Sequence, residues 1–282
     1  MDRRPRRGDR TGEEGDLLLT GPPTAAPATP LPTAAPAAPL TVTVLGSDGS
    51  YPGPGGACSG YLVTAGPVRH PSTSVWLDAG SGTLANLQRH VGLTDLDAVV
   101  LTHAHADHWT DLEGYYVACK WFLGHAGVAV YAPRGLQGMT IGIADDGTLV
   151  WHDIAAGDLV AIGDLRLAFS RTDHPVETLA VRIDAGGRSI GYSADTGPAW
   201  AMSALGPVDL AVVEASFLSD KEGTVQHLSA RQAGATARDA GAGRLVITHI
   251  GPTIDRAAAR AEASASFGAP VEVAVAGARY QA

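Results

Sequence analysis

The amino-acid sequence predicts an α+β fold with β-sheets in the middle and helices outside. Three observations support this prediction. Strand-like apolar runs recur along residues 41–282, helical runs are interleaved with them, and a chain of 282 residues is long enough to bury a sizeable core.

Strand-like runs begin with the alternating segment 41–45 and continue to residue 248. They are predicted at 41–45, 61–64, 74–77, 98–102, 128–131, 165–170, 179–183, 189–193, 210–213 and 245–248. Helical runs are predicted at 83–91, 112–123, 230–240 and 256–267. Ser229 and Gln232 form a capping box at the start of the third helix.

The first 40 residues are predicted to form a disordered extension outside the fold. Pro and Ala fill 14 of the 20 positions from 21 to 40, a composition that cannot pack a core. Arg3 and Arg4 do not begin an export signal, because the apolar run at 17–19 is far too short. No stretch approaches the roughly 20 apolar residues of a membrane span. We therefore expect a cytoplasmic protein with one folded domain over 41–282.

Composition narrows the function classes. The chain has 20 Lys and Arg against 29 Asp and Glu, and its net charge of −9 argues against a protein that mainly grips nucleic-acid phosphates. Its two cysteines exclude a disulfide framework and a Cys-rich zinc site. Ten histidines are unusual beside only two lysines, so their arrangement is the informative feature.

His103, His105, Asp107 and His108 form a dense cluster directly after the predicted strand 98–102. In an extended chain His103 and His105 point the same way, so two imidazoles are available for one metal ion. Asp107 and His108 lie where the chain turns toward the next helix, and they are placed to serve a second ion. A polar loop that happens to hold three histidines is the alternative, but such clusters are typical of functional sites.

The motif His-x-His-x-Asp-His resembles the signature of the metallo-β-lactamase superfamily, and later motifs follow in that family's order. His174 precedes a predicted strand, Asp195 lies in Ser-Ala-Asp-Thr-Gly, and His249 ends the run Leu-Val-Ile-Thr-His. Asp78, in Leu-Asp-Ala-Gly, resembles the buried acidic residue that supports the first motif. The resemblance covers the whole body and implies a four-layer αββα sandwich.

The resemblance also implies a site for two divalent metal ions. One ion would be held by His103, His105 and His174, the other by Asp107, His108 and His249, with Asp195 as the bridge. Two ions about 3.5–4 Å apart lower the pKa of a shared water, so that hydroxide is available at neutral pH. Imidazoles and carboxylates suit Zn²⁺, but Mn²⁺ or Fe²⁺ would load the same ligands, so the metal identity stays open.

His227 and Glu214 suggest the phosphodiesterase branch of the family. Phosphodiesterases that resemble tRNase Z carry a histidine before Ser or Thr, as in the segment Gln-His-Leu-Ser around His227. As an imidazolium it would protonate the leaving oxygen or stabilise the phosphoryl oxygens. Glu214 would orient His227 or have a purely structural role, and the alternative for His227 is a surface histidine at a helix start. With Asp107, these two complete the predicted catalytic set.

The interval from 109 to 173 argues against a tRNA substrate. tRNase Z enzymes hold tRNA with a long basic arm, whereas this interval contains only four basic residues, namely Lys120, Arg134, Arg166 and Arg171. The sequence resembles instead a compact actinobacterial group of atypical cyclic-nucleotide phosphodiesterases of this fold. The segments that carry this likeness are 106–108, 111–114, 173–175 and 227–229.

Two further segments carry weaker expectations. The glycine-rich stretch 47–56 lacks a phosphate-loop signature and is expected to form a wall near the metals. The apolar run 115–123 has helical spacing and is expected to be core, with Tyr115 or Trp121 as alternatives for lining a base pocket. No function is expected for the remaining histidines, which are His70, His90, His125 and His152.

These observations together predict a dinuclear metal-dependent hydrolase. The expected substrate is a small cyclic nucleotide such as 3′,5′-cAMP, attacked by a metal-bridging hydroxide. We expect no long nucleic acid and no membrane as partners, and a homodimer is compatible with the family. The alternatives are a lactonase or other ester or amide hydrolase, a tRNase Z-like RNA-processing nuclease, and, least favoured because every ligand position is filled, a non-catalytic binding module.

Overall fold

Two seven-stranded β-sheets form the centre of the protein. The computed structural model describes residues 39–282, so the predicted tail lies outside the described residues up to position 38. The first sheet contains β1 (Leu40–Gly46), β2 (Gly60–Ala65), β3 (Thr73–Ala79), β4 (Ala98–Val100), β5 (Val128–Pro133), β6 (Leu149–Ile154) and β14 (Arg279–Gln281). The second contains β7 (Leu159–Ile162), β8 (Leu165–Arg171), β9 (Leu179–Ala185), β10 (Arg188–Tyr192), β11 (Leu210–Glu214), β12 (Arg244–Thr248) and β13 (Glu272–Val273). Their spatial orders are β14-β1-β2-β3-β4-β5-β6 and β13-β12-β11-β10-β9-β8-β7.

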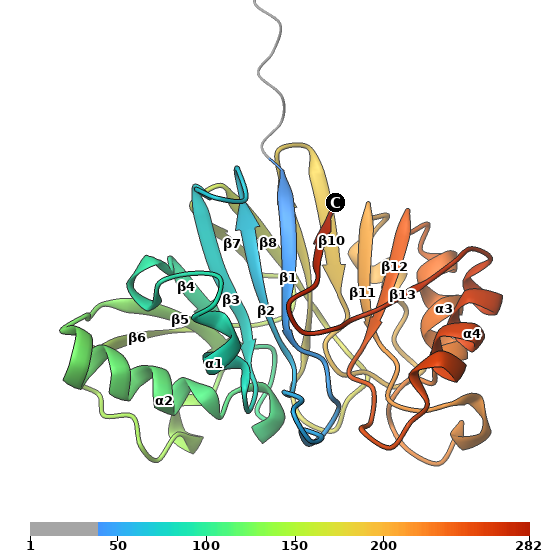
Figure 1. Cartoon of the computed structure of the whole chain (residues 1–282), viewed down its shortest axis with the longest axis horizontal. Helices are drawn as coiled ribbons and strands as arrows, with labels where there is room; N and C mark the ends of the chain where they lie inside the picture. The colour runs from blue at the N-terminus through green and yellow to red at the C-terminus, as the bar shows by residue number, and fades with distance from the viewer. Residues whose placement is uncertain (1–38) are drawn as a thin grey trace, which may run out of the picture. The chain divides into compact units, whose positions relative to one another are not determined.

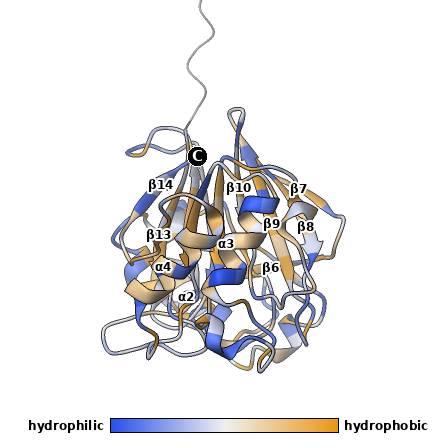
Figure 2. Cartoon of the chain, turned by 90° about the vertical axis from the view of Figure 1, so that its right-hand side faces the viewer, coloured by the Kyte–Doolittle hydropathy of each residue, from blue (hydrophilic) through white to orange (hydrophobic). Residues whose placement is uncertain are grey.

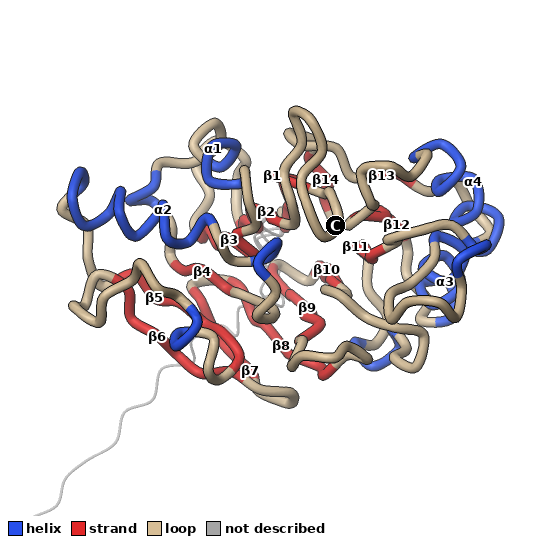
Figure 3. The backbone as a smooth tube through the Cα atoms, turned by 90° about the horizontal axis from the view of Figure 1, so that it is seen from below, coloured by secondary structure: helices blue, strands red, loops and turns tan. Residues whose placement is uncertain are grey.

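Helices cover the outer faces of both sheets. The longer ones are α1 (Thr83–Leu87), α2 (Asp111–Val117) with a π-helical continuation (Ala118–Leu123), α3 (Ala230–Asp239) and α4 (Arg256–Phe267). Short 3₁₀ helices lie at Leu93–Asp95, Ala106–His108, Gln137–Met139, Met202–Leu205 and Ser219–Lys221. Figures 1 and 3 show α1 and α2 on one side of the strands and α3 and α4 on the other. No helix among residues 39–282 is long and apolar enough to cross a membrane.

Three hydrophobic clusters separate the layers. The cluster between the sheets contains side chains from both of them, for example Val63 and Val181. Between the first sheet and α2, Trp76 of β3 packs against Tyr115 of α2. Between the second sheet and its helices, Val213 of β11 packs with alanines of α3 and α4. In Figure 2, α3 and α4 carry both hydrophobic and hydrophilic residues in front of the sheet, as expected for helices with one buried face. The predicted four-layer αββα arrangement is confirmed.

The apolar run 115–123 differs in part from the expectation. Tyr115 is fully buried in the core, so it lines no base pocket. Trp121 and Phe122 are 69% and 81% exposed. The helix widens into a π-helix from Ala118, and this changes the angle between successive side chains. The second half of the run therefore turns away from the face that the α-helical spacing predicts.

Parallel strands of both sheets converge on one edge of the fold. In the first sheet β3 runs parallel to β4, and in the second β10, β11 and β12 run parallel to one another. Asp78 lies near the end of β3, Glu214 ends β11, and His249 directly follows β12. The carboxyl ends of parallel strands are the usual place for ligand-binding residues in α/β sheets. Segments far apart in the sequence meet there.

Candidate metal centre

The signature cluster leaves the end of β4 in a tight turn. Residues Ala106–His108 form a 3₁₀ helix, and His103 and His108 are completely buried. The turn lies directly on Gly80, where an added Cβ would fall 2.0 Å from the carbonyl oxygen of Asp107. Glycine at position 80 therefore allows the backbone of the turn at Asp107 to lie directly against the backbone that follows β3.

Three groups of possible metal ligands meet at this edge; two of them share Asp195, and the third is Glu214, His227 and His249. The first group is His103, His105, His174 and Asp195, and the second is Asp107, His108, Asp195 and His249. Within each group the ligand atoms all lie within 4.8 Å of one another. All seven residues that the family resemblance implies as ligands are brought together, and they divide between two positions as the resemblance implies.

Asp195 is the residue that both groups share. Its Oδ1 lies 3.2 Å from His108 Nε2 and 3.4 Å from His249 Nε2. Its Oδ2 lies 3.5 Å from His103 Nε2 and 3.9 Å from His174 Nε2. One carboxylate oxygen therefore faces each group, so Asp195 could contribute a ligand atom to both positions.

The donor set fits divalent ions. His103 Nε2, His108 Nε2 and Asp195 Oδ1 are buried and have no hydrogen-bond partner among the described residues. Buried polar atoms normally have partners, so these atoms need a ligand of another kind. His105 Nδ1 and His174 Nε2 lie 3.0 Å apart and add two more imidazole nitrogens. Nitrogen and carboxylate oxygen donors match the preference of zinc and of similar first-row metals.

The protonation states differ between the two groups. Burial lowers the pKa of His103 to about 4 and that of His174 to about 3, although Asp195 opposes both shifts. These two imidazoles are neutral at pH 7, and a neutral imidazole is the form that binds metal. The first group therefore needs no proton to leave His103 or His174 when an ion enters.

His108 and His249 show the opposite shift. Burial is the largest single effect and lowers the pKa of each, but the neighbouring carboxylates, Asp195 first among them, together outweigh it, so that the pKa of His108 is raised well above its usual value and that of His249 is raised. Asp78 adds to the effect at His108, and a hydrogen bond with Asp107 adds to it at His249. An ion that enters the second group must displace the proton that His108 carries on Nε2, so its affinity falls as the pH falls.

Asp78 supports the centre from below. Its carboxylate accepts hydrogen bonds from the Thr102 backbone N–H at 2.8 Å, the Thr102 hydroxyl at 2.9 Å and the Tyr192 hydroxyl at 3.0 Å. It also lies 2.8 Å from His108 Nδ1, which fixes the tautomer that presents Nε2 to the centre. Asp78 thus links both sheets to one ligand imidazole.

Replacing Asp78 by asparagine is expected to destabilise the metal-free protein by about 3–5 kcal/mol, because it leaves a buried imidazole without its carboxylate. Asn tolerates the left-handed backbone of Asp78 (φ 55°), so the change removes charge without adding strain. Urea unfolding in the presence of a chelator measures the loss. Asp97→Asn is the control, because Asp97 is exposed and accepts a bond from the Ser74 N–H. Equal effects of the two changes would contradict this role of Asp78.

His227 and Glu214 form a pair beside the second group. His227 Nδ1 lies 3.1 Å from Glu214 Oε1, and the His227 ring stacks on that of His249 with centroids 5.5 Å apart. Burial lowers the pKa of His227, but the Glu214 carboxylate raises it to about 9. The imidazolium form therefore predominates at neutral pH. The His227 side chain is 22% exposed, so substrate can reach it.

Ser216 is a site residue that the sequence analysis missed. Its hydroxyl donates to Glu214 Oε2 at 2.6 Å and lies 3.0 Å from His249 Nδ1. With its proton committed to Glu214, Ser216 Oγ accepts from His249 Nδ1, and Nε2 of His249 faces the centre. Ser216 follows Glu214 by two positions, and this spacing in extended chain places two side chains on one face. That spacing was the available signal.

The remaining histidines lie outside these groups. Among the described residues, His70, His90, His125 and His152 belong to none of the possible metal-ligand groups. His152 instead stacks on Tyr131 across the β5–β6 pair. No function was expected for these four residues from the sequence, and the structure brings none of them to the centre.

Comparisons with known proteins agree with this architecture. A β-lactamase superfamily domain matches residues 73–250. An uncharacterised protein of Mycobacterium tuberculosis is 36% identical over 249 residues, which are 83% of this chain and 89% of that protein. A ribonuclease Z of Mycobacterium bovis is 30% identical over 270 residues, covering 82% of this chain and 94% of that one.

A metallo-hydrolase from Bacillus subtilis is similar in both sequence and structure. The protein, named probable metallo-hydrolase YhfI, is 31% identical over 246 residues, covering 84% of this chain and 97% of its own. Its crystal structure superposes with a TM-score of 0.79 over 87% of this chain and all of that chain, at 28% identity. The similarity therefore extends over the whole described fold.

Proposed function

The chain belongs to the β-lactamase superfamily and is a metal-dependent hydrolase, and we propose that it hydrolyses a phosphodiester bond in a small nucleotide, with 3′,5′-cAMP as the leading candidate. The observation that supports this most is the His227–Glu214 pair beside the second ligand group. A phosphodiester with a sugar leaving group needs a proton at the departing oxygen, and an imidazolium supplies one.

The ligand groups provide for the other half of the reaction. Two divalent ions held there, for which we propose zinc, would activate a water and offset the charge on the phosphoryl oxygens. Asp107 and Asp195 bring negative charge to these positions, and the neutral His103 and His174 bring lone pairs without charge. The result is a cationic spot for one phosphate within an acidic protein.

Glu214 serves the proposed acid in two ways. It keeps His227 protonated, and its contact with Nδ1 directs the proton on Nε2 toward the substrate. Glu214 is itself fixed, because its Oε1 accepts from the Thr196 backbone N–H at 2.5 Å. Thr196 directly follows Asp195 in the chain. The backbone segment that carries Asp195 therefore also holds Glu214, the partner of His227.

The basic residues of the interval 109–173 support a small substrate. Each of the four already has a partner within the protein. Lys120 pairs with Asp146, Arg134 with Asp153, and Arg166 and Arg171 donate to backbone carbonyls. The interval itself forms α2, the π-helix and β5 to β8, which are parts of the fold. A long polyanion would therefore find few free cations there.

An RNA-processing nuclease is the second candidate, favoured by the identity to a ribonuclease Z. A substrate panel separates the candidates. We expect purified protein loaded with Zn²⁺ or Mn²⁺ to hydrolyse 3′,5′-cAMP and bis(p-nitrophenyl) phosphate, and to leave precursor tRNA and an acyl-homoserine lactone intact. Cleavage of the precursor tRNA would favour the nuclease. Hydrolysis of the lactone without turnover of either phosphodiester would contradict the proposed function and support a lactonase.

A further inference from the structure

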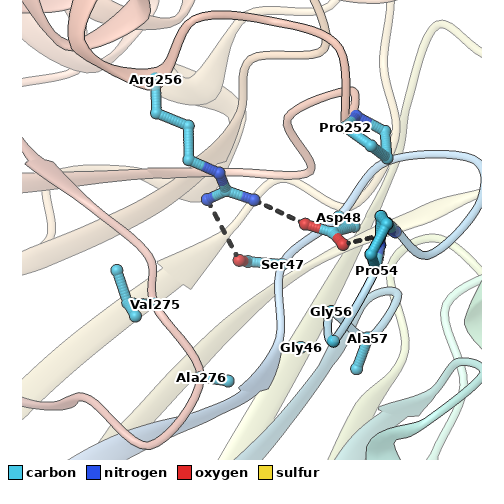
Figure 4. Close-up of a pocket in the computed structure, with 12 residues that line it drawn as sticks. Gly46, Ser47, Asp48, Pro54, Gly56, Ala57, Pro252, Arg256, Val275 and Ala276 are labelled. Carbon is cyan, nitrogen blue, oxygen red and sulfur yellow. Dashed lines mark hydrogen bonds and ion pairs between the residues drawn. The ribbon is translucent and has the colours of Figure 1, made fainter.

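The glycine-rich loop between β1 and β2 lies against the second ligand group. Its beginning and end line a cavity of about 360 Å³, together with Arg256 at the start of α4 and Pro252 (Figure 4). The loop carries no ligand of either metal group. Its contacts nevertheless reach Asp107 and His249, two of the proposed ligands.

Ser50 makes the contact with Asp107. Its backbone N–H donates to Asp107 Oδ2 at 2.9 Å, and the same oxygen lies 3.2 Å from His249 Nε2. Ser50 has a left-handed backbone (φ 63°), which turns this N–H toward the carboxylate. The loop thus holds the orientation of a ligand carboxylate through one hydrogen bond.

The same loop lies on the backbone of His249. The Gly49 N–H donates to the carbonyl oxygen of Ile250 at 3.1 Å, and the Ile250 N–H donates to that of Ser47 at 3.1 Å. A Cβ at Gly49 would fall 2.5 Å from the His249 carbonyl oxygen. The loop therefore contacts two proposed ligands of the second group.

One ion pair anchors this loop to the helix behind it. Arg256 Nη2 lies 2.6 Å from Asp48 Oδ1, while Asp48 Oδ2 accepts from the Gly53 N–H at 2.9 Å (Figure 4). Arg256 also donates to the Ala274 carbonyl at 3.1 Å. Asp48 is only 8% exposed, so the carboxylate of this pair is shielded from solvent, while the Arg256 side chain is partly exposed. A Cβ at Gly56 would meet Asp48 Oδ2, so this glycine keeps space for the carboxylate.

We propose that Asp48 and Arg256 are positioning residues for the second metal ion. Their ion pair fixes the loop, the loop presents the Ser50 N–H to Asp107, and Asp107 is thereby held at the distance from His249 that a shared ion requires. The first group, which contains neither Asp107 nor His249, does not depend on this chain of contacts. The inference rests on the proposed metal ligands and not on the proposed substrate.

Arg256→Gln tests the proposal by metal content. Chelator competition with Zn²⁺ and elemental analysis are expected to show the first ion bound as in the wild type, and the second bound roughly 10- to 100-fold more weakly, which is the usual effect of losing a group that orients a ligand. Arg256→Lys keeps one charged donor, so its affinity for the second ion is expected to lie between those of the wild type and Arg256→Gln. The control is Arg188→Gln, because Arg188 pairs with Asp209 at 3.1 Å and lies at the start of β10, at the far end of the strand from Asp195.

A second pair of variants keeps the test independent of α4. Ser50→Pro removes the N–H that faces Asp107 and, because proline cannot adopt the positive φ of this residue, also displaces the loop, whereas Ser50→Gly keeps both the N–H and the loop conformation. We expect the second ion to be weakened by Ser50→Pro and unchanged by Ser50→Gly. Wild-type affinity for both ions in Arg256→Gln and in Ser50→Pro would overturn the positioning role. Fewer than two ions in the wild type would overturn the ligand assignment, and with it this inference.

Discussion

Replacing His227 by alanine is expected to lower the turnover of 3′,5′-cAMP by roughly 10²- to 10⁴-fold, the range that a positioned general acid contributes. His227 belongs to neither of the two ligand groups that share Asp195, so both ions are expected to remain bound. The loss arises because the sugar oxygen then departs without a proton. Steady-state kinetics and metal analysis on the same preparation measure the two quantities.

The leaving group distinguishes acid catalysis from a structural role of His227. p-Nitrophenolate departs readily without a proton, so the same variant is expected to lose far less activity on bis(p-nitrophenyl) phosphate than on cAMP. His70→Ala, a change at an exposed histidine in the β2–β3 loop, is the control and should change neither rate. Equal losses on the two substrates would show that His227 does not act as the acid.

The pH profile provides a second measurement of the same role. The pKa of His227 is raised to about 9, so its imidazolium is present below that pH and lost above it. Ions in the centre offset the charges of Asp195 and Asp107, which contribute to this shift, whereas the Glu214 contact remains. For cAMP, wild-type turnover is therefore expected to fall as the pH rises toward 9. The His227→Ala variant should lack that decrease.

Several of the proposed ligands stand out in the sequence because they lie next to a strong local pattern. His103 and His249 both follow an apolar strand that ends in threonine, and Asp107 and His108 lie within a few residues of His103. A buried strand that ends in polar residues points to the carboxyl edge of a sheet, where the ends of neighbouring parallel strands lie side by side. Local patterns therefore marked the first cluster, and the family resemblance brought His174, Asp195 and His249 to it.

The contacts that support the ligands could not be predicted in this way. Tyr192 reaches Asp78 across the two sheets, and Ser50 reaches Asp107 through a backbone N–H that any residue type carries. Neither the composition nor the periodicity of the sequence predicts these two contacts. The outer strand β6 was also missed, because most of its residues are partly or fully exposed and no buried run marks it. Tertiary packing alone determines these features.

Asp195→Asn is expected to have the most severe effect on the centre. The change preserves the shape of the side chain but removes the negative charge shared by both groups, and an amide offers only one acceptor oxygen in place of two. Binding of both ions is expected to weaken, and activity to fall by roughly 10³-fold or more, the upper range for losing one stabiliser of transition-state charge. Metal titration monitored by calorimetry, together with cAMP turnover, measures both effects.

The number of ions affected shows whether Asp195 is a bridge. A bridging carboxylate contacts both ions, so its loss weakens both, whereas a ligand of one ion would leave the other at wild-type affinity. Asp173→Asn is the matched control, because Asp173 neighbours His174 but donates no ligand atom to either group and instead accepts from the Ala199 N–H at 2.9 Å and Gln226 at 2.7 Å. We expect this control to bind two ions as the wild type does. If Asp195→Asn weakened the binding of only one ion, Asp195 would be a ligand of that ion alone. The contact of its other carboxylate oxygen with the remaining group would then be structural.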